Sequence, residues 1–160
     1  MAKRRWLFLV TATILLSTAA PAQSEPCWYK AEPGDLVGQS LCTARTLRCE
    51  FPDGQFANWD KGDLSIAPTT TPMRLIFDNV DVGKQTGRVI GNQGGENILA
   101  VGGVQVLHLL EQTGTGNMNM TSVFASADPK TGFLRAVHSR HIHIRGPIPS
   151  QYYGTCEATP

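Results

Sequence analysis

The sequence lacks the short motifs that mark the common enzyme classes. It has no Gly-x-Ser-x-Gly turn for a serine nucleophile, no His-Glu-x-x-His motif for zinc, and no glycine-rich loop that opens a helix and holds phosphate. Its glycine clusters lie between strand-like runs, where glycine serves turns. Catalysis, with a hydrolase-type reaction as its simplest form, therefore ranks third as a function, behind ligand binding and metal binding.

A long apolar run is also missing. The run over residues 6–16 has about eleven residues, against the roughly 20 that span a bilayer. It follows the basic Lys3-Arg4-Arg5 and precedes Ala20-Pro21-Ala22, whose small residues have the spacing that a signal peptidase cleaves. The pattern predicts a bacterial Sec-type signal peptide over 1–22 and a single secreted β domain over 23–160, in the periplasm or outside the cell.

The chain has no strong charge of either sign. It holds 14 Lys and Arg residues against 13 Asp and Glu residues, and removal of the leader takes away three of the basic ones, which leaves a net charge of −2. This balance offers no general electrostatic attraction for nucleic acid or anionic membrane. We expect the partner to be a small molecule or a protein of the cell envelope.

No Cys-x-x-Cys pair is present, which argues against a cysteine metal site. An even number of cysteines in an exported chain predicts disulfides instead. Three pairings are open, and we favour those in which Cys156 bonds to Cys27 or into the region of Cys42 and Cys49. The cysteines are Cys27, Cys42, Cys49 and Cys156.

Helical periodicity is absent after the leader, and residues 23–44 read as loop. Alternating runs follow, with turn signals every eight to twelve residues. The pattern predicts an all-β fold, a mostly antiparallel up-and-down meander of seven to nine strands that closes as a barrel or sandwich with two disulfides. A first strand over 46–51 ends at Pro52-Asp53-Gly54, and residues 61–72 read as a connection or an edge element.

Residues 96–145 hold four of these strands and all four histidines. We place a two-residue turn at Gly102-Gly103, a second turn at 113–116 and a third at 128–132. Tight closure of these turns sets a register. It opposes Val101 to Val104, Gln112 to Asn117, and Ala127 to Gly132.

This register aligns four polar residues in one row, above an apolar part of the same face. Arg140 stands in the next row. Convergent polar groups above an apolar floor describe a site for a small apolar or amphipathic ligand; the alternative is a hydrogen-bonded polar belt at the edge of the core. A slip of one residue would exchange the faces of a strand. The row consists of Asn97, His108, Thr121 and His138.

A second candidate site uses His141 and His143. Their imidazoles share one face of a strand at a spacing of about 7 Å, and Met118 stands beside His141 on the next strand. Thioether and imidazole together suit copper, and the two imidazoles suit zinc. No third imidazole shares this face, so the alternative is an exposed strand with incidental histidines. A periplasmic copper- or zinc-binding protein is the second functional hypothesis; the first needs no cofactor.

Four segments also support the prediction that the protein is exported. They are Cys42-x6-Cys49, Leu-Glu-Gln-Thr-Gly at 110–114, Ala-Val-His-Ser-Arg-His at 136–141, and the run 149–156 that ends in Cys156. These segments resemble parts of small exported proteobacterial β-proteins that have no assigned function. The resemblance covers roughly residues 42–156, and it implies an exported β-protein without implying any activity.

Overall fold

The computed structural model describes residues 27–59, 62–69, 71–91 and 94–160. The predicted signal peptide lies outside these residues. The described part contains the helix α1 (Leu36–Thr43) and nine strands. The strands are β1 (Thr46–Asn58), β2 (Ser65–Pro68), β3 (Met73–Asp81), β4 (Thr86–Gly91), β5 (Gly94–Gly103), β6 (Val106–Gln112), β7 (Met118–Ala127), β8 (Leu134–His143) and β9 (Pro147–Thr159).

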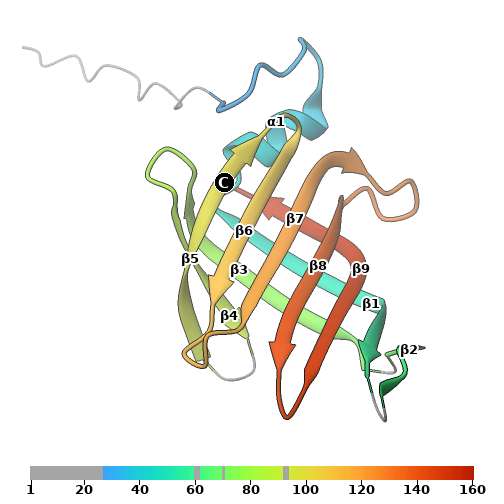
Figure 1. Ribbon diagram of the computed structural model, residues 1–160. Helices are drawn as coiled ribbons and strands as arrows, with labels where there is room; N and C mark the ends of the chain where they lie inside the picture. The colour runs from blue at the N-terminus through green and yellow to red at the C-terminus, as the bar shows by residue number, and fades with distance from the viewer. Residues whose placement is uncertain (1–26, 60–61, 70, 92–93) are drawn as a thin grey trace, which may run out of the picture.

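The strands form one antiparallel sheet that closes on itself (Figure 1). Its order is β2-β1-β3-β4-β5-β6-β7-β8-β9, and β1 also pairs with β9, so eight strands make a barrel and β2 is an extra strand on β1. Apart from the β2 excursion, each strand pairs with the next along the chain. The predicted all-β up-and-down fold is therefore confirmed, and its closed form is the barrel.

Strand β1 is longer than the sequence pattern predicts. We expected it to end at Pro52, but it runs to Asn58, and its register against β9 shifts between Glu50 and Asp53. Proline lacks an amide donor, which a bulge tolerates as well as a turn does. The two backbones come so close here that a Cβ on Gly154 would collide with the Glu50 carbonyl oxygen.

One end of the barrel is covered by α1 (Figure 1). Leu41 on this helix is fully buried. The expectation of loop over residues 23–44 is wrong for this segment. An eight-residue helix is too short to show a clear period, and its signals are an N-cap at Asp35, which accepts the Gly38 N–H at 2.8 Å, and tertiary packing.

Trp28 completes the cover at this closed end. Its Nε1–H donates to the Gly103 carbonyl oxygen at 3.2 Å, and its ring lies where a Cβ on Gly102 would stand. Gly102 therefore makes room for an aromatic ring within β5. The predicted two-residue turn at Gly102-Gly103 is wrong, because the turn lies at Val104 and Gln105, where Gln105 has a φ of 56°.

Two disulfides staple the fold. Cys27–Cys42 ties the segment that carries Trp28 to α1, and Cys49–Cys156 joins β1 to β9, where the strands close the barrel. The prediction of two disulfides, with Cys156 bonded back toward the first part of the chain, is confirmed. Disulfides of this kind indicate an oxidising, extracytoplasmic environment. No helix in the described part is long and apolar enough to cross a membrane.

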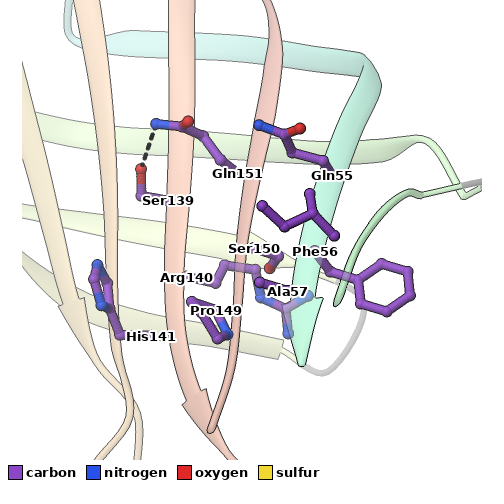
Figure 2. Close-up of a pocket in the computed structure, with 10 residues that line it drawn as sticks. Gln55, Phe56, Ala57, Ser139, Arg140, His141, Pro149, Ser150 and Gln151 are labelled. Carbon is purple, nitrogen blue, oxygen red and sulfur yellow. Dashed lines mark hydrogen bonds between the residues drawn. The ribbon is translucent and has the colours of Figure 1, made fainter. Parts of the chain in front are cut away.

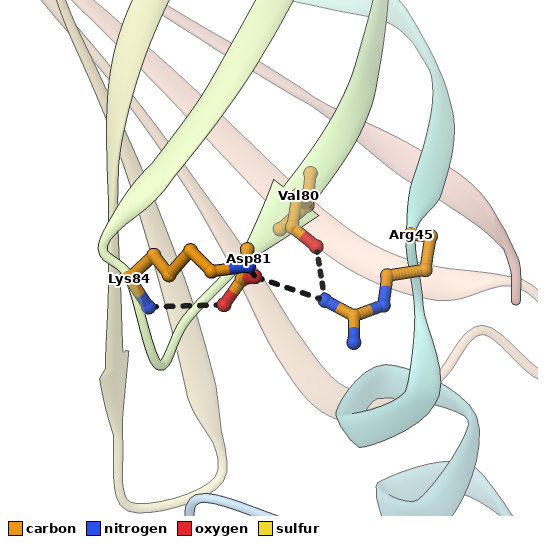
Figure 3. A network of polar contacts seen from close by, with 4 residues as sticks. All are labelled: Arg45, Val80, Asp81 and Lys84. Atoms are coloured by element: carbon orange, nitrogen blue, oxygen red, sulfur yellow. Dashed lines mark hydrogen bonds and ion pairs between the residues drawn. The ribbon is translucent and has the colours of Figure 1, made fainter. Parts of the chain in front are cut away.

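A polar network holds the turn after β3 to the start of β1, next to α1 (Figure 3). The Arg45 guanidinium donates to the Val80 carbonyl oxygen at 3.0 Å and lies 3.8 Å from the Asp81 carboxylate, which also pairs with Lys84 at 2.9 Å. Hydrogen bonds from Lys84, together with nearby positive charge, lower the pKa of Asp81. The closed end is therefore fastened by apolar, covalent and polar contacts together.

Candidate functional site

The end of the barrel opposite α1 is hollow. A cavity of about 740 Å³ opens there, within the roughly 300 to 1,000 Å³ that small-molecule sites occupy. It lies among the ends of β3 to β9. Its lining comprises Thr71, Pro72, Met73, Arg74, Leu75, Val89, Gly91, Gly94, Glu96, Glu111, Thr113, Gly114, Thr115, Asn117, Asn119, His138, Arg140, Ile142, Ile144 and Tyr152.

Only part of the predicted polar row faces this interior. Strand β6 pairs with β7 one residue away from the expected register, so Thr121 opposes Leu109 and not His108. Side chains alternate between the two faces of a sheet, so a shift of one residue reverses the face on which each β6 side chain is expected. His108 lies on the outer face, where its Nδ1 is 2.9 Å from the Ser122 hydroxyl oxygen, and the exposed Asn97 also lies outside the cavity. The prediction of one row that joins all four residues is wrong.

The pairing of β7 with β8 agrees with the predicted register beyond a bulge between Val123 and Ala127. Thr121 opposes His138, and Asn119 opposes Arg140. Thr121 and His138 are buried, and Arg140 lines the cavity beside them. The structure therefore brings together three of the five predicted ligand-binding residues.

His138 lies deep in the cavity, packed between two aromatic rings. Its Nδ1 is 2.7 Å from the Thr121 hydroxyl oxygen, and its ring centroid is 5.7 Å from that of Phe51 and 6.2 Å from that of Tyr152. Burial, aided by the positive charge of Arg140, lowers the pKa of His138 to about 4. The imidazole is therefore neutral near pH 7 and presents a polar group without a charge.

The next row toward the mouth carries charge. Asn119 lies between Glu111 and Arg140 on the neighbouring strands, and its Nδ2 donates to the Glu111 carboxylate at 2.7 Å. Its Oδ1 is buried without a hydrogen-bond partner among the described residues. Arg140 makes no ion pair or hydrogen bond with another described residue, since the ion pairs of this part of the chain use other cations. Two strong polar groups thus remain unmatched on one wall.

Strands β3 and β4 supply a different wall. Met73, Leu75 and Val89 line the cavity from these strands, and Ile142 adds a further apolar side chain from β8. The alternation of strand side chains explains the contrast, because each wall presents every second residue of its own strands. The cavity is therefore mainly apolar along β3 and β4, where the exposed Arg74 is paired with Glu50, and mainly polar along β6, β7 and β8.

Sequence reasoning missed two residues of the polar wall, Glu111 and Tyr152. The slipped register placed Glu111 on the outer face. Tyr152 belongs to β9 and opposes His138. Tyr152 and Cys156 are an even number of residues apart in one strand, so their side chains share a face. This spacing could have placed Tyr152 on the inner face together with Cys156.

The predicted metal-binding residues lie on the outer surface. His141 and His143 are exposed, and Met118 directly opposes His141, as the register predicts. Within the part of the chain that the structure describes, no group of three or more His, Cys, Asp and Glu residues stands close enough to hold a metal ion. Two imidazoles alone therefore make an incomplete site.

A smaller depression of about 240 Å³ lies on the outer surface over β1, β8 and β9 (Figure 2). Figure 2 shows His141 at one edge and the Phe56 ring at the other. Gln151 donates to the Ser139 hydroxyl oxygen at 3.3 Å across its floor. Arg140 lines this depression as well as the interior cavity, whereas Asn119, with its buried Oδ1, lines the interior cavity and not the depression. The larger interior cavity is therefore the stronger candidate for a ligand.

Comparison with known proteins identifies no relative. No protein-family model, no curated protein and no solved structure matches this chain. The resemblance to small exported proteobacterial proteins therefore stays a prediction, and the function rests on the site alone.

Proposed function

We propose that this protein is an exported binding module that holds a small amphipathic molecule in the open end of its barrel. The apolar part of the ligand packs against Met73, Leu75 and Val89, and its polar end meets the wall formed by Glu111, Asn119 and Arg140. The observation that carries the proposal is the pair of unmatched groups on that wall, the Arg140 guanidinium and the Asn119 Oδ1.

The two unmatched groups favour a particular polar end. A guanidinium offers only donors, so it binds an acceptor such as a carboxylate, whereas an amide oxygen needs a donor. A carboxylate with a hydroxyl or amide nearby satisfies both groups at once. A buried polar atom without a partner costs about 1 to 3 kcal/mol, and a ligand that satisfies it recovers part of that cost.

Binding fits the site better than catalysis does. The Thr121 hydroxyl is buried beneath His138, and no third group orients the imidazole as a general base among the described residues. Disulfides indicate an extracytoplasmic compartment, and with the predicted leader they support release into the periplasm or the medium. A barrel with one closed and one open end suits the capture of a molecule from that medium.

The test is recovery of a bound molecule from the protein purified without detergent or denaturant, by native mass spectrometry and by analysis of an organic extract. We expect a small amphipathic adduct on the wild type. Arg140→Leu should reduce its retention about 10- to 100-fold, in line with about 1.5 to 3 kcal/mol for a hydrogen bond to a charged group. Leu75→Trp should reduce it further by filling the cavity.

The matched control is Arg135→Leu, which removes an exposed arginine of the same strand from the outer face. It should retain the adduct as the wild type does. Absence of any adduct from wild-type preparations of several expression hosts and growth media would reject the proposal. Equal loss in Arg140→Leu and Arg135→Leu would also reject it, because the cavity would then play no part.

A further inference from the structure

A second cluster of chemically related side chains lies on the outer face of the barrel, near its open end. The chain has four methionines and four histidines, and two of each lie on the outer side of β7 and β8. Met118 and both histidines are exposed, and Met120 is partly exposed. The cluster, which we call the Met-His patch, consists of Met118, Met120, His141 and His143.

The strand register brings the four side chains together. Met118 directly opposes His141, and such pairs have Cβ atoms about 4.5 to 5.5 Å apart. Met120 and His143 stand two residues further along their strands, on the same face and in opposite directions from the central pair. The His143 amide donates to Asn117 Oδ1 at 2.9 Å, which fastens the end of β8 beside the start of β7.

The donor atoms of the patch select a soft metal ion. All four cysteines are held in disulfides, so no thiolate competes for a metal. Thioether sulfur and imidazole nitrogen suit Cu(I), whereas zinc in proteins takes thiolate, imidazole and carboxylate ligands. The outward residues that flank the patch on β6 and β9 include no carboxylate. They are Leu110, Gln112, Pro147, Pro149 and Gln151.

From this arrangement we propose that the Met-His patch binds one Cu(I) ion. Met118 and His141 are the central ligands, and Met120 and His143 complete the coordination from either side. Met118, His141 and His143 are exposed and Met120 is partly exposed, and Figure 2 shows the His141 imidazole at one edge of the outer depression. The patch lies on the outside of the wall whose inside carries Asn119 and Arg140, so this site is independent of the ligand cavity.

The test is competition for Cu(I) between the oxidised mature protein and a chromophoric Cu(I) chelator, under anaerobic conditions. We expect one Cu(I) per chain. Met118→Leu and His141→Ala should each weaken binding at least tenfold, and Met120→Leu and His143→Ala should each weaken it by a smaller factor. X-ray absorption at the copper edge should show both sulfur and nitrogen neighbours, with the sulfur signal reduced in Met118→Leu.

Matched controls separate this site from general effects on folding. Met73→Leu removes the methionine of the cavity, and His108→Ala removes the outer histidine of β6; neither should change Cu(I) affinity. Arg140→Leu should weaken ligand retention and leave Cu(I) binding intact, so the two proposals fail separately. Leucine conserves methionine volume at small cost, and thermal unfolding without metal will show that the variants are folded.

Two outcomes would overturn the proposal. One is that the protein takes no Cu(I) from the chelator. The other is that Cu²⁺ or Zn²⁺ binds as tightly as Cu(I) while the methionine variants bind as the wild type does. That result would show two histidines acting alone, without thioether ligands.

Discussion

The two ends of the barrel are built from the same strands, yet they differ in almost every property. At the closed end the interior is filled by apolar side chains, and α1 with Trp28 lies across it. At the open end the same strands surround a cavity whose one wall holds Arg140, Asn119 and a buried, neutral His138. Apolar packing is therefore concentrated at one end, and the unmatched Arg140 guanidinium and Asn119 Oδ1 lie at the other. The closed end has a buried group without a partner among the described residues as well, the Tyr29 hydroxyl beside α1.

This difference shows how a small barrel separates stability from binding. Apolar burial contributes about 25 cal/mol per Å², and it is densest where α1 seals the interior. A ligand site needs space and unmatched polar groups, both of which cost stability. Placing them at the far end leaves the closed end intact, so substitutions at the two ends should have different consequences.

The largest effect on stability should come from removing the disulfide between β1 and β9. Replacement of Cys49 and Cys156 by alanine opens a loop of 107 residues and should lower the free energy of unfolding by about 4 to 5 kcal/mol. The same change at Cys27 and Cys42, which close 15 residues, should cost about 3 kcal/mol. Urea unfolding of the two double variants measures both. A larger loss for the shorter loop would show that attachment of the cover dominates.

The next effect compares the same truncation at the two ends. Leu41→Ala removes a fully buried side chain from the cover of the closed end and should cost about 3 kcal/mol. Leu75→Ala enlarges a cavity that already exists and should cost about 1 kcal/mol, because few packing contacts are lost there. Equal losses in denaturant unfolding would contradict the contrast between a packed end and a hollow end.

The third effect concerns pH and belongs to the open end. The unfolded chain protonates His138 with a pKa near 6.5 and the folded protein only near 4, so the unfolded state binds more protons between these values. Stability should therefore fall as the pH falls through this window, by at most about 3 to 4 kcal/mol at about 1.4 kcal/mol per pKa unit. His138→Gln should lack this part of the loss. Unfolding free energies at pH 7, 5.5 and 4 test the difference, and parallel curves would contradict it.

The smallest effect separates the two causes of that pKa. Arg140→Gln removes the positive charge beside His138 and should raise the pKa of the imidazole. The pKa should still stay below 6.5, because burial is the larger cause and remains. An NMR titration of the imidazole resonances measures the change. A pKa at its ordinary value in this variant would mean that charge, and not burial, sets the neutrality of His138.

Two errors in the sequence-based predictions occur at a glycine or a proline, because each of these residues is compatible with more than one local structure. Gly102 was assigned to a turn, although it makes room for Trp28, and Pro52 was assigned to the end of a strand, although it lies at a bulge. A longer loop between β6 and β7 than the turn signals predict then moved one strand by a residue. That single slip placed His108 inside and Glu111 outside, because side chains alternate at every residue.

Local chemistry alone was enough for several features. Alternation of apolar residues predicted the meander, its antiparallel order and the edge element that contains β2. The predicted pairing of β7 with β8 holds beyond the bulge, from Val123 to Met118. The cysteine count predicted two disulfides. These properties depend on neighbouring residues or on composition, which a sequence displays directly.

Only the tertiary structure decided which residues meet across the barrel. The burial of His138 between Phe51 and Tyr152 depends on closure of β9 onto β1, and the cover of one end depends on the packing of α1 and Trp28. The alignment of Glu111 with Asn119 depends on the register of β6 against β7. Closure sums the registers of eight strand pairs, so a one-residue error in any of them changes the site. The sequence by itself determined an up-and-down β fold with two disulfides. The registers of all the strand pairs together decided where the cavity lies and which side chains line it.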